Sequence, residues 1–183
     1  MSKINTHGGG CNTTKLGLHF EQSTDLPDVL FDAGYNLTCL PCAGSVLNGY
    51  KVANSMGQHL GIATRKQRFY KDFLEPHGVD WRTRISKQLF PDDVFINDIS
   101  KTVYIIEKKF QSQAGSVDEK LQTCDFKREQ YEKLCAGTGY SVKYTYVANE
   151  WFYKHEYDDV HDYINRSGCY IFCNEIPLSF LGI

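Results

Sequence analysis

Two short apolar segments near the middle of the chain limit its fold most strongly. Residues 94–96 and 102–110 are rich in β-branched and aromatic side chains, and a polar turn separates them. This pattern predicts two neighbouring antiparallel strands. The second segment is apolar enough for a buried strand, yet it ends in the charged residues Glu107, Lys108 and Lys109. Charged groups in a buried strand need a structural or chemical reason to be there.

The rest of the chain alternates helical and extended patterns. Apolar spacing predicts a helix from about residue 14 that breaks or restarts at Pro27, and a helix over 65–74 that ends at Pro76 and Gly78. The other expected elements are a strand over 81–86, a helix from a capping box at Ser116 to about 134, a strand over 141–148, a helix near 157–164 and a strand over 169–173. The order predicts an α/β (α+β) fold, with a mixed central β-sheet flanked by helices.

The length of 183 residues predicts one domain over 1–183. Residues 1–13 are expected to be a loose N-terminus. Residues 34–78 are less certain, and an insertion in the core is the alternative there, because 35–62 gives no clear pattern. No apolar stretch is long enough to span a membrane, and the N-terminus lacks the apolar core of a secretory signal. These features predict a cytoplasmic protein.

Seven cysteines in a chain of this length favour reduced, buried thiols. The spacings of Cys39 with Cys42 and of Cys169 with Cys173 leave a four-thiolate zinc site open as the alternative.

Three residues at one end of the predicted hairpin can carry chemistry. Asp92 precedes the first strand, and Glu107 and Lys109 lie two positions apart on the second, so these two point to the same face. Two carboxylates with a carbonyl or water oxygen suit Mg²⁺. A neighbouring lysine can orient a water molecule for phosphodiester hydrolysis.

Pro91-Asp92, followed fifteen positions after Asp92 by Glu107-Lys108-Lys109, resembles the motif of the PD-(D/E)XK nuclease superfamily. This superfamily includes many type II restriction endonucleases, Holliday-junction resolvases and recombination exonucleases. The resemblance covers about residues 14–148 in element order and implies a restriction-endonuclease-like core.

Further residues agree with this resemblance. Gly17 and Glu21 match a Gly-x-x-x-Glu pattern of resolvase-like members, Gln111 extends the motif to Glu-x-Lys-x-Gln, and segment 115–121 looks like one in restriction-type members. The resemblance implies Glu21, Asp92, Glu107 and Lys109 as catalytic residues with Gln111 as an accessory residue. It also implies that Glu21, Asp92 and Glu107 bind Mg²⁺, for which Mn²⁺ is expected to substitute. Asp93 stays an alternative to Asp92, although it should lie on the other face of the strand.

Each assignment has a structural alternative. Glu21 can be a solvated helix residue, and Gln111 can simply begin a loop. Glu107 and Lys109 can form a charge pair on an exposed sheet face.

The net charge of −2 argues against a protein that coats nucleic acid through bulk positive charge. Residues 65–87, however, hold seven basic side chains against three acidic ones, a local charge of +4. Such a block suits phosphate contacts, and the helix after Ser116 offers a second candidate face. The candidate DNA-binding residues are Arg65, Lys66, Arg68, Arg82, Arg84, Lys87, Lys120, Gln122, Lys127 and Arg128. The alternative is that both stretches are solvated surface.

The resemblance therefore implies a Mg²⁺-dependent endonuclease of restriction type that hydrolyses double-stranded DNA and leaves 5′-phosphate ends. A homodimer is expected, because two-fold symmetry matches a palindromic site. The alternatives are a repair or junction-resolving nuclease and a non-catalytic DNA- or protein-binding module. The sequence identifies neither a recognition site nor a companion methyltransferase.

Overall fold

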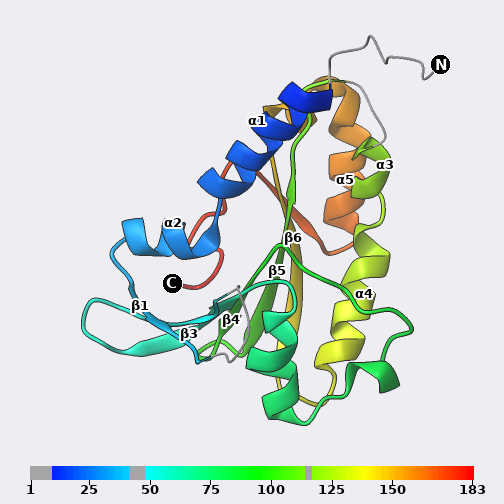
Figure 1. The fold of residues 1–183 in the computed structure, drawn as a ribbon. Coiled ribbons are helices and arrows are strands. Elements are labelled where there is room, and N and C mark those ends of the chain that lie inside the picture. The colour runs from blue at the N-terminus through cyan, green and yellow to red at the C-terminus, as the bar shows by residue number, and fades with distance from the viewer. Residues whose placement is uncertain (1–9, 42–47, 114–116) are drawn as a thin grey trace, which may run out of the picture.

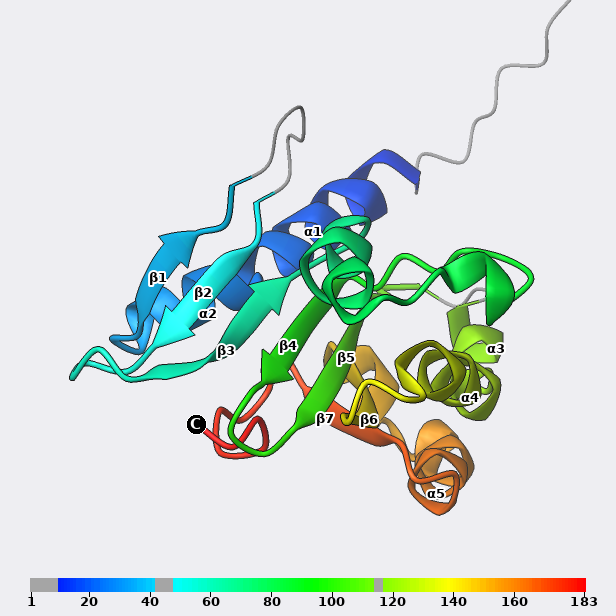
Figure 2. The same ribbon diagram turned by 90° about the horizontal axis from the view of Figure 1, so that it is seen from below.

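A computed structural model describes residues 10–41, 48–113 and 117–183. Its centre is a seven-stranded sheet whose strands follow one another in chain order (Figures 1 and 2). The strands are β1 (Asn36–Cys39), β2 (Tyr50–Ala53), β3 (His59–Thr64), β4 (Asp93–Asn97), β5 (Thr102–Lys109), β6 (Ser141–Ala148) and β7 (Tyr170–Cys173). Strands β1 to β5 pair antiparallel, whereas β5, β6 and β7 pair parallel. The predicted mixed sheet is confirmed.

Helices cover both faces of this sheet (Figure 1). One face packs against α1 (Gly10–Ser23) and α2 (Leu26–Asp32). The other face packs against α4 (Cys124–Cys135) and α5 (Asp158–Arg166), and the short α3 (Val117–Leu121) precedes α4. The remaining turns are a π-helix, Tyr70–Leu74, and the 3₁₀ helices Glu75–His77, Trp81–Thr83, Glu150–Tyr153 and His155–Tyr157. The flanking helices agree with the predicted α+β class.

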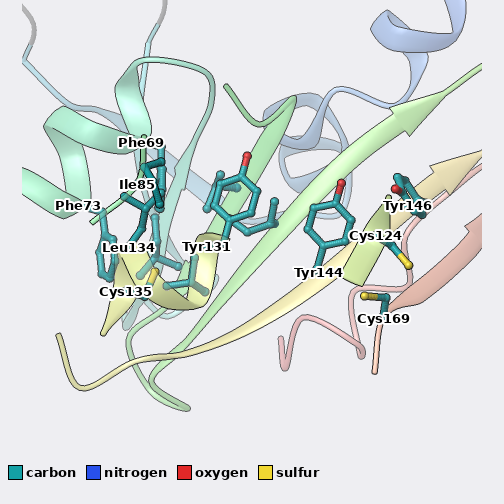
Figure 3. Packing of buried hydrophobic residues seen from close by; sticks show 14 of the residues in the cluster. Phe69, Phe73, Ile85, Cys124, Tyr131, Leu134, Cys135, Tyr144, Tyr146 and Cys169 are labelled. Atoms are coloured by element: carbon teal, nitrogen blue, oxygen red, sulfur yellow. The ribbon is translucent and has the colours of Figure 1, made fainter. Parts of the chain in front are cut away.

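The sheet separates two hydrophobic cores because alternate residues of each strand point to opposite faces. On the α4 side, Ile105 and Tyr144 pack with Tyr131 and Leu134 of α4 (Figure 3). On the α1 side, Ile106 packs with Phe20 and Leu30, among other residues. The two isoleucines of the predicted buried strand therefore serve different cores. The residues before and after these two isoleucines in β5 alternate between the same two faces of the sheet.

The predicted strand over 81–86 is wrong, because Trp81–Thr83 forms a 3₁₀ helix. Asp80 caps this helix, since its carboxylate accepts a hydrogen bond from the backbone N–H of Arg82 at 3.0 Å. Local capping thus outweighs the alternating pattern. The third antiparallel strand is instead β3, from the segment whose pattern was unclear, and β3 pairs directly with β4.

Two helix predictions need correction in detail. Within the expected helix over 65–74, residues Tyr70–Leu74 form a π-helix. Gly78, with a φ of 70°, ends this region as predicted. The expected helix from Ser116 to about 134 is broken between α3 and α4. Its apolar residues Leu121 and Tyr131 are buried as predicted, whereas the Ser116 cap and residues 1–9 lie outside the described residues.

Candidate active site

A row of polar residues crosses the sheet at the start of β4 and the end of β5. Asp93 pairs with Ile106, which places Asp92 opposite Glu107 on the facing strand. Next to Asp92, the backbone N–H of Lys66 donates to the carbonyl of Pro91 at 2.9 Å. Next to Glu107, the parallel strand β6 places Tyr146 as its pairing partner. Opposite residues of an antiparallel pair share one face. Asp92 and Glu107 therefore point to the same side of the sheet, the side that α4 covers.

Three hydrogen-bond donors or positive charges surround the Asp92 carboxylate. Its Oδ1 contacts the ammonium group of Lys66, and its Oδ2 accepts from the backbone N–H of Lys108 at 2.9 Å. Burial alone would raise the pKa of Asp92, but these hydrogen bonds and the nearby charge of Lys109 lower the pKa overall. Asp92 is therefore ionised at neutral pH.

Glu107 receives two ammonium groups on one oxygen. Its Oε2 lies 3.0 Å from Nζ of Lys109 and 3.4 Å from Nζ of Lys127, which projects from α4. The Lys109 ammonium also donates to the backbone carbonyl of Lys108 at 3.1 Å. Glu107 and Lys109 thus share one face, as predicted, and the pair is largely buried rather than on an exposed sheet face.

Aromatic side chains shield this charged group from the side of α4. Tyr131 and Tyr144 lie side by side in Figure 3, with ring centroids 6.0 Å apart. Burial raises the pKa of both tyrosines well above the ordinary value, and the negative charge of Glu107 adds to this effect. The Lys109 ammonium lies 5.6 Å from the ring centre of Tyr146. Uncharged tyrosines therefore exclude water from one side of the carboxylates.

Asp93 and Lys108 form a separate ion pair on the opposite face. Lys108 Nζ lies 2.7 Å from Asp93 Oδ2, and both side chains are buried beneath α1 and α2. Asp93 also accepts from the backbone N–H of Leu26, the first residue of α2. The expectation that Asp93 lies on the other face of the strand from Asp92 is confirmed, and the Lys108 side chain lies on that face with it. Their role is to hold the α1–α2 junction against the sheet.

Burial raises the pKa of Asp93 to about 6, because the Lys108 ammonium only partly offsets the loss of hydration. The unfolded chain has the lower pKa, so the folded state binds the proton more tightly. Stability from protonated Asp93 is present below about pH 4 and is lost as pH rises through about 6. We expect wild type to lose at most about 3 kcal/mol relative to Asp93→Asn between pH 4 and 7. Urea unfolding of both proteins across this range measures the difference, and parallel pH profiles would contradict it.

Glu21 shares a cleft with Asp92 but not with Glu107 or Lys109. It is exposed on α1 and lines a cleft of about 230 Å³ with Asp92, Lys66, Arg65 and Lys108, among other residues. The backbone carbonyl of Glu21 accepts a hydrogen bond from Lys108 Nζ at 3.1 Å. Across the described chain, no three His, Cys, Asp or Glu side chains gather closely enough to hold a metal ion. The structure therefore brings Asp92 and Glu107 together and places Glu21 at the rim of the adjacent cleft.

The site offers oxygen atoms of the kind that a hard divalent cation prefers. Asp92 and Glu107 offer two carboxylates, and the Lys108 carbonyl adds a further oxygen. The Lys109 ammonium donates to both Glu107 and this carbonyl. Mg²⁺ is usually held by one or two carboxylates and keeps several of its waters. Asp92, Glu107 and the Lys108 carbonyl are thus the residues that would hold it.

Gln111 lies in the loop that follows β5, as its structural alternative expected, and its side chain is buried. Asn149 holds its backbone on both sides, since Asn149 Oδ1 accepts from the Gln111 N–H and Asn149 Nδ2 donates to its carbonyl. Within residues 10–41, 48–113 and 117–183, neither polar atom of the Gln111 side-chain amide has a hydrogen-bond partner. A buried amide without partners is costly and is typical of a position that a water molecule or a ligand completes.

Arg68 requires a correction among the predicted DNA-binding residues. Its side chain is only 1 % exposed and forms a two-point ion pair with Asp72. Arg68 therefore stabilises the fold and cannot reach DNA. Arg65 and Arg128 are also engaged, with Asp25 and with Asp125 and Glu132 respectively. The candidates with exposed side chains are Arg82, Arg84, Lys87, Lys120 and Gln122.

The contact between Lys127 and Glu107 was not expected from the sequence, which assigned Lys127 to a DNA-binding face. A signal for it is present in the helix pattern. Lys127 falls three positions after Cys124 and four before Tyr131, and both of these are buried. A lysine on the buried stripe of a helix points toward the core and needs an acidic partner there.

The alternative of one four-thiolate zinc site is excluded by the sheet order. Cys39 belongs to the edge strand β1, whereas Cys169 and Cys173 lie at the opposite edge, next to or in β7. Cys42 lies outside the described residues. Cys169 instead packs against Cys124 at the start of α4 (Figure 3), and both thiols are buried.

Comparison of the chain with protein families, with curated proteins and with solved structures gave no match. Within the described part of the chain, no helix has the length and apolar character needed to cross a membrane.

Proposed function

We propose that this chain is a Mg²⁺-dependent DNA endonuclease with a restriction-endonuclease-like core. The observation that carries this proposal is the group formed by Asp92, Glu107 and Lys109. The carboxylates of Asp92 and Glu107 lie at the start of β4 and the end of β5, and the Lys109 ammonium lies 3.0 Å from Glu107, in a site that is only partly open to solvent. The element order around it, with an antiparallel meander followed by α4 and a parallel β6, supports the same core.

Each residue has a defined part in the proposed hydrolysis. Asp92 and Glu107 would hold the cation, which when bound supplies positive charge at the phosphate and acidifies a water molecule. Lys109 donates hydrogen bonds beside Glu107 and would orient the attacking water for in-line displacement at phosphorus. Tyr131 and Tyr144 keep bulk water from one side, which strengthens these electrostatic contacts.

The exposed residues Arg82, Arg84 and Lys87 are the proposed phosphate or base contacts of the duplex. Because the overall charge is near zero, the proposed enzyme depends on specific contacts more than on bulk attraction. We therefore propose a restriction-type enzyme that acts as a homodimer in the cytoplasm, since two copies cut the two strands of a palindromic site.

A panel of DNA substrates tests this proposal. Purified protein is incubated with plasmid, linear duplex and four-way junction DNA, in Mg²⁺ or in EDTA. Discrete fragments from plasmid and linear duplex in Mg²⁺ alone are expected. A smear would indicate a nonspecific nuclease, and cleavage confined to the junction would indicate a resolvase. No cleavage of any substrate with Mg²⁺ or Mn²⁺ would leave a non-catalytic binding module.

A further inference from the structure

More positive than negative charge gathers at the proposed cation site. The two carboxylates of Asp92 and Glu107 contact three ammonium groups, those of Lys66, Lys109 and Lys127. The group therefore carries a net charge of +1 when all five are ionised. Orienting a water molecule needs only one of these lysines, and Lys109 already lies between Glu107 and the Lys108 carbonyl. Lys66 and Lys127 need a separate explanation.

Lys66 and Lys127 differ from Lys109 in origin and in exposure. Lys109 lies on the same strand as Glu107, and its side chain is 12 % exposed. Lys66 comes from the loop after β3 and is 42 % exposed, whereas Lys127 comes from α4 and is 29 % exposed. Both have a flexible four-carbon stem whose ammonium group can move to solvent or to another anion without any backbone movement.

The backbone of Lys66 also departs from what its residue type prefers. Its φ is 47°, in the left-handed region that residues other than glycine rarely adopt. The hydrogen bond from its N–H to the Pro91 carbonyl holds this conformation one residue from Asp92. The loop after β3 thus presents an ammonium group directly to one of the two carboxylates.

We infer that Lys66 and Lys127 compete with the divalent cation for the Asp92 and Glu107 carboxylates, and thereby couple cation binding to DNA binding. In the free protein each lysine neutralises one carboxylate. When the cation binds, the two ammonium groups are released at the edge of the site. DNA phosphates are the anions that reach this edge in the proposed complex, so the released lysines bind them. This inference rests on the proposed nuclease function.

Thermodynamic linkage makes the coupling measurable without any cleavage. If DNA phosphates take up the two lysines, DNA must raise the affinity of the protein for the cation, and the cation must raise the affinity for DNA by the same factor. Removing the lysines should have two opposite effects. The cation should bind more tightly in the absence of DNA, and the enhancement by DNA should shrink.

Calorimetric titration with Ca²⁺, with and without a duplex, tests this inference. The variants are Lys66→Gln, Lys127→Gln and the double variant, and Lys71→Gln removes the same charge from an exposed side chain as the control. Without DNA, we expect each single variant to bind Ca²⁺ about threefold more tightly than wild type and the double variant about tenfold, as for partly exposed ion pairs. We expect the enhancement by DNA to be lost in the double variant. Circular dichroism verifies that each variant is folded.

The result that overturns the inference is Ca²⁺ binding by the lysine variants no tighter than that of Lys71→Gln. This failure is distinguishable from failure of the proposed function. A protein that cleaves DNA but shows no change in the variants would contradict only the lysine competition. A protein that shows tighter Ca²⁺ binding in the variants but cleaves no DNA in Mg²⁺ would contradict only the nuclease proposal.

Discussion

Replacing Lys109 with methionine is expected to lower the rate of DNA cleavage about 10²- to 10⁴-fold, the contribution typical of a positioned proton-transfer or water-orienting group. The reason is the position of its ammonium group, 3.0 Å from Glu107 and 3.1 Å from the Lys108 carbonyl. Methionine keeps the unbranched stem but removes the charge and the hydrogen-bond donors. Single-turnover cleavage of a duplex in saturating Mg²⁺ measures the effect.

Lys133→Met is the matched control, because it makes the same change at an exposed position of α4. We expect it to cleave DNA at the wild-type rate. DNA binding by Lys109→Met in Ca²⁺ should stay close to that of wild type, because Lys109 is largely buried beside Glu107 and is not among the proposed contacts with the duplex. Cleavage by Lys109→Met within tenfold of wild type would remove Lys109 from the proposed mechanism.

Replacing Arg68 with methionine is expected to lower the free energy of unfolding by about 3–5 kcal/mol, the usual cost of removing one partner of a buried ion pair. The Arg68 guanidinium contacts both oxygens of Asp72, at 3.0 Å and 2.6 Å. Asp72 also accepts a hydrogen bond from Thr64 at the end of β3. In the variant, the Asp72 carboxylate stays buried without its counter-charge.

Urea unfolding followed by circular dichroism measures this effect. Arg82→Met is the matched control, because Arg82 is exposed and its removal should change stability by about 0.5 kcal/mol or less. The double variant Arg68→Met with Asp72→Leu should recover part of the loss, since no uncompensated charge remains. A loss below about 1 kcal/mol in Arg68→Met would show that the pair is not buried as described and would reopen a DNA-binding role.

Strand periodicity correctly predicted which side chains of β5 share a face. The alternation of β5 placed Glu107 and Lys109 on one face and Lys108 on the other, and the register with β4 brought Asp92 opposite Glu107. The side-chain period of a strand is fixed at two, so these relations follow once the strand is recognised. The 3₁₀ helix Trp81–Thr83, which Asp80 caps, did not follow from the alternating pattern over 81–86.

Burial of charged residues was the part that the sequence pattern could not predict. Arg68 and Asp72 are four positions apart, a spacing that is equally common on solvated helices. The pair is internal because it packs against Thr64 of β3 and against the backbone at Leu40 and Gly49. The position of Glu21 is a similar case. The Gly-x-x-x-Glu spacing correctly placed Glu21 on the first helix, but it did not predict how far Glu21 lies from Glu107. Such relations depend on how elements dock, which local sequence does not encode.

Cleavage of supercoiled plasmid by wild type and by Glu107→Gln, purified in parallel, tests the nuclease proposal most directly. Glutamine keeps the shape of Glu107 and removes the charge that Lys109 and Lys127 contact and that the proposed cation would require. We expect wild type to convert the plasmid to linear fragments in Mg²⁺ and not in EDTA, and Glu107→Gln to leave it supercoiled. Equal cleavage by the two proteins, or no cleavage by wild type in Mg²⁺ or Mn²⁺, would contradict the proposal.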